Sequence, residues 1–237
     1  MGRAFEYRRA AKEKRWGKMS TLFPRLGKAI TLAAKEGGTD PEMNAKLRLA
    51  IQAAKAENMP KDNIENAIKR ADHQDMANFV EAFYEGKAPY GVLVYIECAT
   101  DNTNRTVSNL KAYFSRSGGQ IVPSGQLEYM FDRKAVFEFN KIEGMDRDSL
   151  ELELIDAGLE ELEETEEGGF VAYSDYTTFG DMQKALEGLK ADVQKASLKR
   201  FPKNPVELTD EQMAEIDKLM EKVENDDDVQ QVFTNIA

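Results

Sequence analysis

The sequence predicts a multidomain α+β protein: an N-terminal helical bundle followed by two α/β domains of the ferredoxin-like type, the third inserted in the second. Three observations predict this plan. Apolar residues recur at helical spacing up to about residue 70, and short strand-like runs begin near residue 78. Residues 135–201 then follow the order β-α-β-β-α-β. The last strand-like run, 228–236, has no neighbour of its own. We therefore expect it to return to the sheet of the middle domain.

Residues 1–75 are expected to form a basic helical bundle. An opening helix covers about residues 4–18 and buries little, because its best apolar face is thin. Later helices are predicted over 20–37, 40–57 and 59–70. In the second of these, we expect Asp40 as the N-cap, Pro41 at the first helical position and Met43 in the apolar stripe.

The two α/β domains are expected to interrupt one another in the chain. The middle domain takes residues 76–133 plus 205–237, and the inserted domain takes 134–204. In the middle domain, alternating Leu127, Tyr129 and Phe131 predict a strand over 125–134. Its other elements are expected to be strands over 78–86 and 90–100 and helices over 101–117 and 210–224.

Familiar catalytic and membrane signatures are missing from the sequence. The single cysteine, Cys98, lies in an apolar strand and is expected to be a small buried residue. The single histidine, His73, lies in a polar stretch typical of a linker. One cysteine and one histidine cannot supply a zinc site, and no glycine-rich nucleotide motif is present. We therefore expect no metal, no cofactor, no membrane span and a cytoplasmic location.

Charge is divided very unevenly along the chain. Residues 1–71 carry 16 basic and 8 acidic side chains, whereas residues 72–237 carry 16 basic and 35 acidic ones. On the opening helix, Arg8, Lys12 and Arg15 share one face, and Tyr7 and Trp16 are suited to stacking on bases. This pattern predicts a polyanion-binding module, the alternative being a solvated charged face. The predicted nucleic-acid contacts are Arg3, Arg8, Arg9, Lys12, Lys14, Arg15, Lys18, Arg25, Lys28, Lys61 and Arg105.

The segment TDNTNRT at 100–106 allows two interpretations. It enters a helix whose free amides attract anions, and Arg105 could add a contact to phosphate. Ordinary capping by Asp101 or Asn102, with Arg105 paired to a carboxylate, explains the same residues. The sequence alone leaves both open.

Two acidic runs, EELEETEEGG at 160–169 and NDDDV at 225–229, are both expected to be solvated surface. A metal-dependent enzyme built on Asp226, Asp227 and Asp228 is a lesser hypothesis, because neighbouring residues on a strand or loop rarely converge on one ion. The acidity is expected instead to keep the two α/β domains away from nucleic acid. A third hypothesis is a scaffold whose acidic domains bind a basic partner.

Several stretches resemble the YebC family, also called the PmpR family. They are NMPKDNIENAIKR at 58–70, YEGKAPYGVLVYIECATDNTNRTVSNLKAYFSRSGG at 84–119 and SGQLEYMFDRK at 124–134. The resemblance extends over nearly the whole chain and implies three domains, a helical bundle and two α/β domains. The opening GRAFEY departs from the family's usual start, so no residue-specific contact is transferred to it.

The resemblance implies a non-enzymatic regulator of gene expression that binds nucleic acid. Some members are described as DNA-binding transcriptional regulators. Others act in translation, including the mitochondrial activator of cytochrome c oxidase subunit I and factors that relieve stalled ribosomes. The expected partner is therefore DNA, with ribosomal RNA or tRNA on the ribosome as the alternative.

Overall fold

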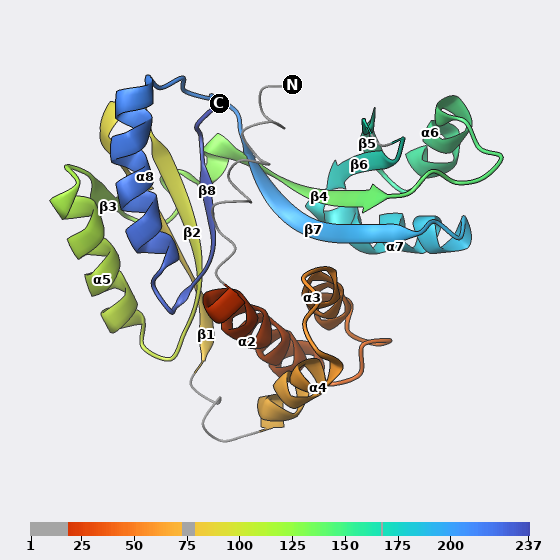
Figure 1. The fold of residues 1–237 in the computed structure, drawn as a ribbon, viewed down its shortest axis with the longest axis horizontal. Coiled ribbons are helices and arrows are strands. Elements are labelled where there is room, and N and C mark those ends of the chain that lie inside the picture. Colours follow the sequence, from red (N-terminus) through yellow and green to blue (C-terminus); the bar gives the residue numbers. More distant parts are fainter. Residues whose placement is uncertain (1–18, 73–78, 167) are drawn as a thin grey trace.

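The computed structural model describes residues 19–72, 79–166 and 168–237. Figure 1 shows two sheet domains side by side and a group of helices that lies across one side of both. The helices are α2 (Met19–Gly37), α3 (Ala45–Ala56) and α4 (Lys61–Lys69), followed by the 3-10 turn η1 (Arg70–Asp72). The predicted opening helix over 4–18 and His73 lie outside the described residues.

The helical bundle closes around its own apolar core. Ile30, Leu47, Ala54 and Ile64 are among the buried residues that α2, α3 and α4 contribute to it. The Thr31 hydroxyl crosses this core and donates a hydrogen bond to the Ala67 carbonyl at 2.8 Å. The bundle is therefore a packed unit with its own core.

The start of α3 differs from the prediction. Asp40 and Pro41 precede the helix, and its N-cap is Asn44, whose Oδ1 accepts a hydrogen bond from the Leu47 amide. The Asn44 side chain is buried and also donates to the Ala33 carbonyl, so it fixes α3 against α2. Met43 falls outside the helix and is 84% exposed, which contradicts its predicted place in the apolar stripe.

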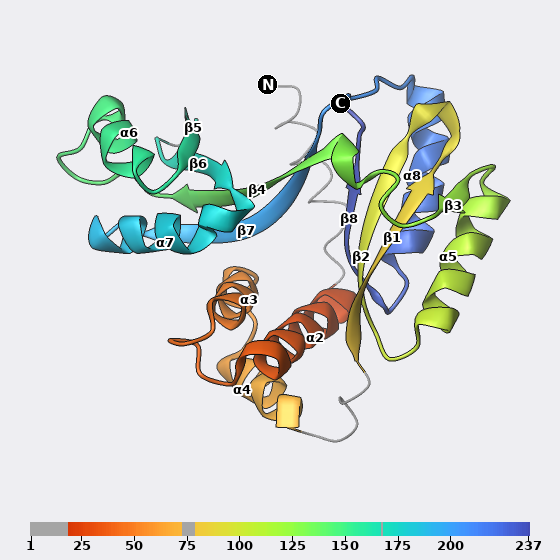
Figure 2. The same ribbon diagram turned by 180° about the vertical axis from the view of Figure 1, so that it is seen from behind.

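The first sheet contains β1 (Val80–Lys87), β2 (Leu93–Thr100), β3 (Gln120–Val122) and β8 (Val229–Thr234). Their order is β3-β1-β2-β8, and all neighbours are antiparallel. The closing strand β8 thus pairs with β2. Helices α5 (Thr103–Arg116) and α8 (Asp210–Glu224) pack against the same face, which in Figure 2 is the face turned away from the viewer. A 3-10 turn, η3 (Pro89–Gly91), joins β1 to β2.

The second sheet has the predicted β-α-β-β-α-β order. Its strands are β4 (Phe131–Phe139), β5 (Leu159–Glu164), β6 (Phe170–Asp175) and β7 (Val193–Pro202), arranged β5-β6-β4-β7. Helices α6 (Arg147–Ile155) and α7 (Phe179–Gly188), the latter preceded by the turn η5 (Tyr176–Thr178), cover one face. The core centres on Phe137, which stacks on Phe179 with ring centroids 4.8 Å apart. The predicted fold class is confirmed.

The strand predicted over 125–134 is wrong for its first six residues. Residues 125–130 do not extend; they loop into a short 3-10 turn, η4 (Glu128–Met130), and β4 begins only at Phe131. The cause is Glu85, whose carboxylate is buried and accepts hydrogen bonds from the Gly125 and Leu127 amides. These amides therefore bind a carboxylate instead of a neighbouring strand.

A long ribbon joins the two sheets. β4 and β7 stay paired from Phe131 opposite Pro202 to Phe139 opposite Val193, so the expected boundary between residues 133 and 134 lies inside β4. Where the ribbon meets the first sheet, the Arg200 guanidinium lies 3.9 Å from the centroid of the Tyr95 ring. The domain ranges themselves stay a prediction.

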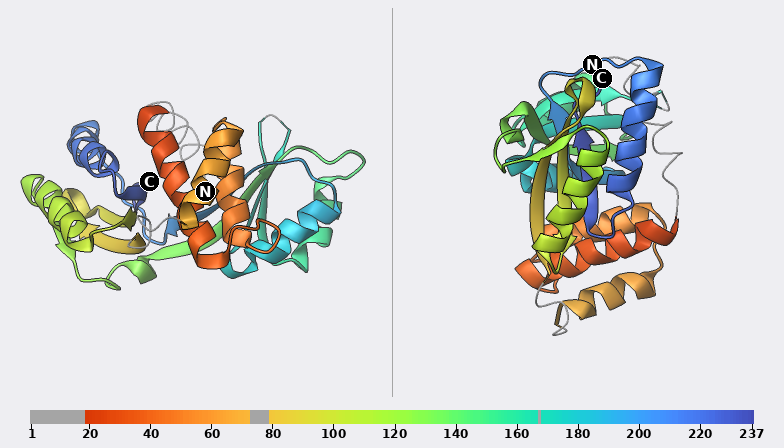
Figure 3. Two further views of the ribbon diagram at one scale, coloured as in Figure 1. Left: turned by 90° about the horizontal axis from the view of Figure 1, so that it is seen from below. Right: turned by 90° about the vertical axis from the view of Figure 1, so that its left-hand side faces the viewer.

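The bundle lies against both sheets, as two perpendicular views show (Figure 3). Helix α2 contacts β2 and β8, and α3 contacts β7. Within the described residues, no helix is long and apolar enough to cross a membrane. The contact of α2 with β8 brings basic side chains of the bundle to the acidic turn before β8.

Candidate nucleic-acid interface

Most of the predicted contacts cannot be placed. Seven of the predicted basic residues lie outside the described residues: Arg3, Arg8, Arg9, Lys12, Lys14, Arg15 and Lys18. The described part of the bundle, residues 19–72, carries nine basic and seven acidic side chains. The positive charge of the leading module is therefore concentrated in its first 18 residues, where seven basic side chains face only two glutamates.

Lys61 is the most accessible of the four predicted contacts that the structure does describe. It begins α4, and its side chain is 87% exposed. Its nearest carboxylate oxygen is Glu65 Oε1 at 3.7 Å, one helical turn later. An exposed pair of this kind is weak and easily exchanged, so Lys61 can contact a phosphate at little cost.

Arg25 and Lys28 of α2 face the turn between α8 and β8. Lys28 Nζ donates to the Asp227 carbonyl at 2.5 Å and lies 3.7 Å from Asp228 Oδ1. Burial lowers the pKa of Arg25, although the nearby carboxylates of Glu224, Asp227 and Asp226 act in the opposite direction. Both cations are thus directed to acidic groups of the middle domain.

Arg105 is paired within the protein at the start of α5. Asn102 is the N-cap, and its Oδ1 accepts a hydrogen bond from the Arg105 amide at 3.0 Å. The Arg105 side chain donates to Asp101 Oδ1 at 2.8 Å and to both oxygens of Asp228, at 2.9 and 3.0 Å. Capping and carboxylate pairing, one of the two interpretations of TDNTNRT, are therefore the contacts present here.

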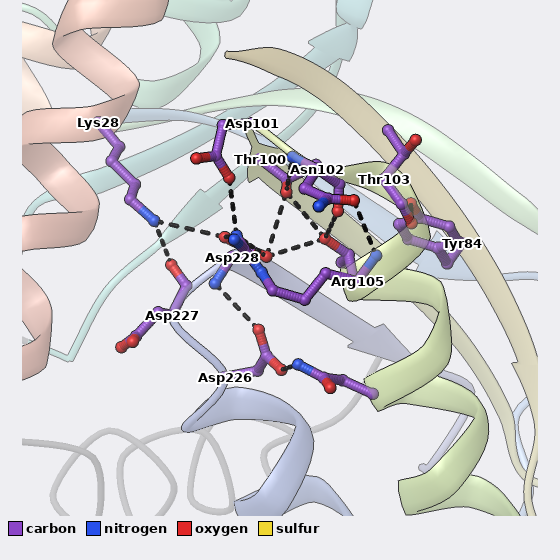
Figure 4. Close-up of polar contacts among 12 residues, drawn as sticks. Lys28, Tyr84, Thr100, Asp101, Asn102, Thr103, Arg105, Asp226, Asp227 and Asp228 are labelled. Carbon is purple, nitrogen blue, oxygen red and sulfur yellow. Dashed lines mark hydrogen bonds and ion pairs between the residues drawn. The ribbon is translucent and has the colours of Figure 1, made fainter. Parts of the chain in front are cut away.

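Lys28 and Arg105 both lie close to the carboxylate of Asp228 (Figure 4). Its side chain is buried, and Oδ2 also accepts hydrogen bonds from the hydroxyls of Thr106 at 2.8 Å and Thr100 at 3.1 Å. Burial acts to raise the pKa of Asp228, but the hydrogen bonds from Arg105, Thr106 and Thr100 outweigh it and hold the pKa below its ordinary value. Arg105 therefore already has a buried carboxylate as its partner, and the amide of Arg105 is capped by Asn102.

The neighbouring Asp226 belongs to the same network. It is buried, and its Oδ2 accepts hydrogen bonds from Asn109 at 3.0 Å and Tyr113 at 3.1 Å, both on α5. Its Oδ1 accepts one from the Asp228 amide, which closes the turn. The prediction that NDDDV is solvated surface is therefore wrong for these two aspartates, although Asp227 between them is exposed.

We call Lys28, Arg105, Asp226 and Asp228 with their partners the Asp228 network. It ties three elements distant in the chain, α2, α5 and the turn before β8. The sequence predicts its aspartates as loop surface, because their donors lie more than a hundred positions away in the chain. These donors are Thr100, Thr106, Asn109 and Tyr113. The only local signal was the acceptor-rich segment TDNTNRT.

The remaining candidates are the single cysteine, Cys98, and the side chains that could bind a metal ion. Cys98 is buried in β2, and burial first, with the charges of Asp226 and Asp228 next, raises its pKa far above the ordinary range. Its thiol therefore stays protonated. Among residues 19–72, 79–166 and 168–237, no group of three or more histidine, cysteine or acidic side chains is arranged to hold a metal ion.

These features define a three-part α+β protein: a helical bundle, a four-stranded sheet domain, and a second sheet domain inserted between β3 and α8 of the first. Two family descriptions match the chain. The TACO1/YebC N-terminal domain matches residues 3–74, and the TACO1/YebC second and third domain matches residues 79–236. The chain belongs to the TACO1/YebC family.

Individual relatives agree with this assignment. Probable transcriptional regulatory proteins of Wolinella succinogenes and Sulfurimonas denitrificans are 64% and 57% identical to this chain, each over the full length of both sequences. The crystal structure of a conserved hypothetical protein from Aquifex aeolicus has 34% identity and a TM-score of 0.77, covering 94% of this chain and 91% of that one. The names of the sequence relatives support a regulatory role.

Proposed function

We propose that this protein is a non-enzymatic regulator of gene expression that binds nucleic acid through the basic side chains of its leading segment. The observation that carries the proposal is the concentration of charge: seven basic and two acidic residues between positions 3 and 18, beside a nearly neutral remainder of the bundle. The proposed phosphate contacts are Arg3, Arg8, Arg9, Lys12, Lys14, Arg15 and Lys18.

The four predicted contacts that lie in the described residues have two different roles in this proposal. Lys61 extends the phosphate-binding surface, because it is exposed and only weakly paired. Arg25, Lys28 and Arg105 were predicted as contacts too, but a phosphate would have to displace the Asp227 carbonyl or the Asp228 carboxylate to reach the latter two. We therefore propose that these three mainly hold the bundle and α5 to the acidic turn.

DNA is the target that we propose first, because the relatives are named probable transcriptional regulatory proteins. Contacts to phosphates position a protein on a duplex without reading its bases. The same charge pattern also suits structured RNA, so a ribosome-associated translation factor that binds ribosomal RNA or tRNA and relieves stalled ribosomes remains the alternative.

Binding to labelled duplex DNA and to structured RNA, measured by fluorescence anisotropy over a range of salt concentrations, tests the proposal. If five to seven phosphates are neutralised, the slope of log K against log salt is about −3 to −6. In the variant R8E/K12E/R15E, we expect the affinity to fall at least tenfold and the slope to become shallower by about 2 to 3. Unchanged affinity for every DNA and RNA would overturn the proposal.

The matched control reverses three exposed lysines elsewhere. Lys111, Lys141 and Lys184 lie on the two α/β domains, and K111E/K141E/K184E changes the net charge by the same amount. If binding depends on the leading segment and not on overall charge, this control keeps most of the affinity of the unaltered protein. Equal losses in both variants would mean that the interface is not where we place it.

The nature of the target is decided by crosslinking followed by sequencing of the bound nucleic acid, and by co-sedimentation with ribosomes with and without residues 1–18. Enrichment of promoter DNA without ribosomal RNA supports the transcriptional version. Co-sedimentation that depends on residues 1–18 supports the translational one.

A carboxylate-dependent enzyme is the lesser alternative. Asp226 and Asp228 already accept hydrogen bonds from protein donors, which disfavours their use as ligands of a catalytic ion. We expect no hydrolysis of DNA or RNA with Mg²⁺ or Mn²⁺. Hydrolysis that disappears when Asp226 to Asp228 are replaced would establish the enzyme instead.

A further inference from the structure

Helix α6 presents two large aliphatic side chains to solvent. Leu150 and Leu154 fill the core of the second sheet domain, but Leu152 is 72% exposed and Ile155 is 61% exposed. The last two lie three residues apart, so they are neighbours on the outer surface of the helix. We call Leu152, Ile155 and the acidic residues beside them the outer face of α6.

Acidic side chains border this apolar pair. Asp148 and Asp156 lie one turn before and one turn after Leu152, on the same side of the helix, and both are exposed. The only cation on α6 itself, Arg147, is held by Glu151 at 3.0 Å and by the Leu162 carbonyl at 3.0 Å. Within the described helix α6, no basic side chain therefore lies between Leu152, Ile155 and the two aspartates.

The surrounding segment is the most acidic part of the chain. Residues 142–169 contain twelve aspartates and glutamates and one arginine. Their net charge of −11 equals that of the whole protein, so the remainder of the chain is neutral overall. Exposed glutamates of β5, Glu161 and Glu164, continue the field from α6 onto the edge of the sheet, whereas Glu160 is paired with Lys134.

The negative charge of the outer face of α6 determines which class of partner can bind there. Nucleic acid and anionic membranes are repelled by this field. A second copy docking through the same surface would place its own aspartates opposite these ones, because a two-fold interface pairs each patch with itself. What complements the face is a cationic protein segment that carries apolar side chains.

We propose that the outer face of α6 is a docking site for a lysine- or arginine-rich amphipathic helix of a partner protein. Aliphatic side chains of the partner cover Leu152 and Ile155, and its cations pair with Asp148 and Asp156. In Figures 1 and 2, α6 lies at the end of the second sheet domain that is farthest from the first sheet.

The test uses a fluorescent 18-residue peptide with leucines at helical spacing and lysines elsewhere. We expect it to bind the full-length protein at physiological salt, and we expect L152S/I155S to weaken binding at least tenfold. Asp148→Asn with Asp156→Asn should also weaken binding and reduce its salt dependence. Because Leu152 and Ile155 are exposed, L152S/I155S is expected to unfold thermally at the same temperature as the unaltered protein.

Two controls separate a site from general charge attraction. M43S/Y129S removes two other exposed apolar side chains, which are 84% and 67% exposed, and should leave peptide affinity unchanged. A peptide of the same composition with its leucines scrambled should bind much more weakly. Equal binding by L152S/I155S, or equal binding of the scrambled peptide, would overturn the proposal, as would no binding at all.

Discussion

The two acidic runs of this protein show how little a run of carboxylates reveals by itself. NDDDV at 225–229 and EELEETEEGG at 160–169 have similar composition and support the same prediction of solvated surface. In the structure, Asp226 and Asp228 of the first run are buried and paired. Glu160, Glu161 and Glu164 of the second are exposed on β5, an edge strand.

The difference lies in the donors that reach each run. Asp228 receives hydrogen bonds from Thr100 at the end of β2 and from Arg105 and Thr106 at the start of α5, and it has Lys28 of the bundle nearby. On β5, the glutamates stay at the surface, and their protein contacts come from nearby strands: Glu160 pairs with Lys134 of β4, and Glu163 accepts a hydrogen bond from Tyr173 of β6. A row of like charges on this edge also discourages a foreign strand from pairing with it. One run therefore holds the molecule together, and the other shapes its surface.

The comparison is tested most strongly by removing the buried carboxylate. Asp228→Ala removes the carboxylate that accepts hydrogen bonds from the hydroxyls of Thr100 and Thr106, and it removes the partner shared by Arg105 and Lys28. We expect the free energy of unfolding to fall by about 3 kcal/mol, as measured by urea denaturation. A loss below about 1 kcal/mol would mean that Asp228 behaves like the exposed glutamates.

Acid should affect the two runs differently. The pKa of Asp228 is lower in the folded protein than in the unfolded chain. Its contribution to stability is therefore complete above the unfolded value, near pH 4, and is lost as pH falls through the folded pKa. We expect D228N to be less stable than the unaltered protein at pH 7, with the gap narrowing below about pH 4. A gap that is constant with pH would contradict this assignment.

Much of the fold could be predicted from local patterns. The helix predicted over 210–224 matches α8, and the β-α-β-β-α-β order of the second sheet domain is confirmed. Both depend on periodicity within about fifteen residues, which the sequence displays directly. The strand predicted over 125–134 begins only at Phe131, because Glu85, some forty residues earlier, accepts hydrogen bonds from the Gly125 and Leu127 amides.

The site was harder to predict than the fold for the same reason. Arg105 had two interpretations because the acceptor that decides between them, Asp228, is 123 residues away. The direction of Lys28 depends on Asp227, 199 residues away. Charge counts located a basic leading module correctly as a sequence feature, but they could not indicate which cations the protein itself neutralises.

A smaller effect tests whether the Asp228 network also docks the bundle. Lys28→Ala removes the donor to the Asp227 carbonyl and leaves Asp228 with Arg105 and the two threonines. We expect a loss of about 1 kcal/mol in unfolding free energy, together with faster amide exchange in α2. Lys61→Ala, on an exposed and weakly paired lysine of the same bundle, is the matched control and should change neither quantity. Equal effects of the two substitutions would mean that Lys28 does not help to dock the bundle.

The smallest effect is expected on the acidic strand. E161Q/E164Q removes two charges from β5 at side chains that are both exposed. We expect the unfolding free energy to stay within about 0.5 kcal/mol of the original value, with unchanged acid dependence, because relief of like-charge repulsion is small in water. Binding of the leucine–lysine peptide should weaken slightly, since the acidic field extends to α6. A loss of more than about 1 kcal/mol would show that β5, like the turn before β8, uses its carboxylates to hold the fold.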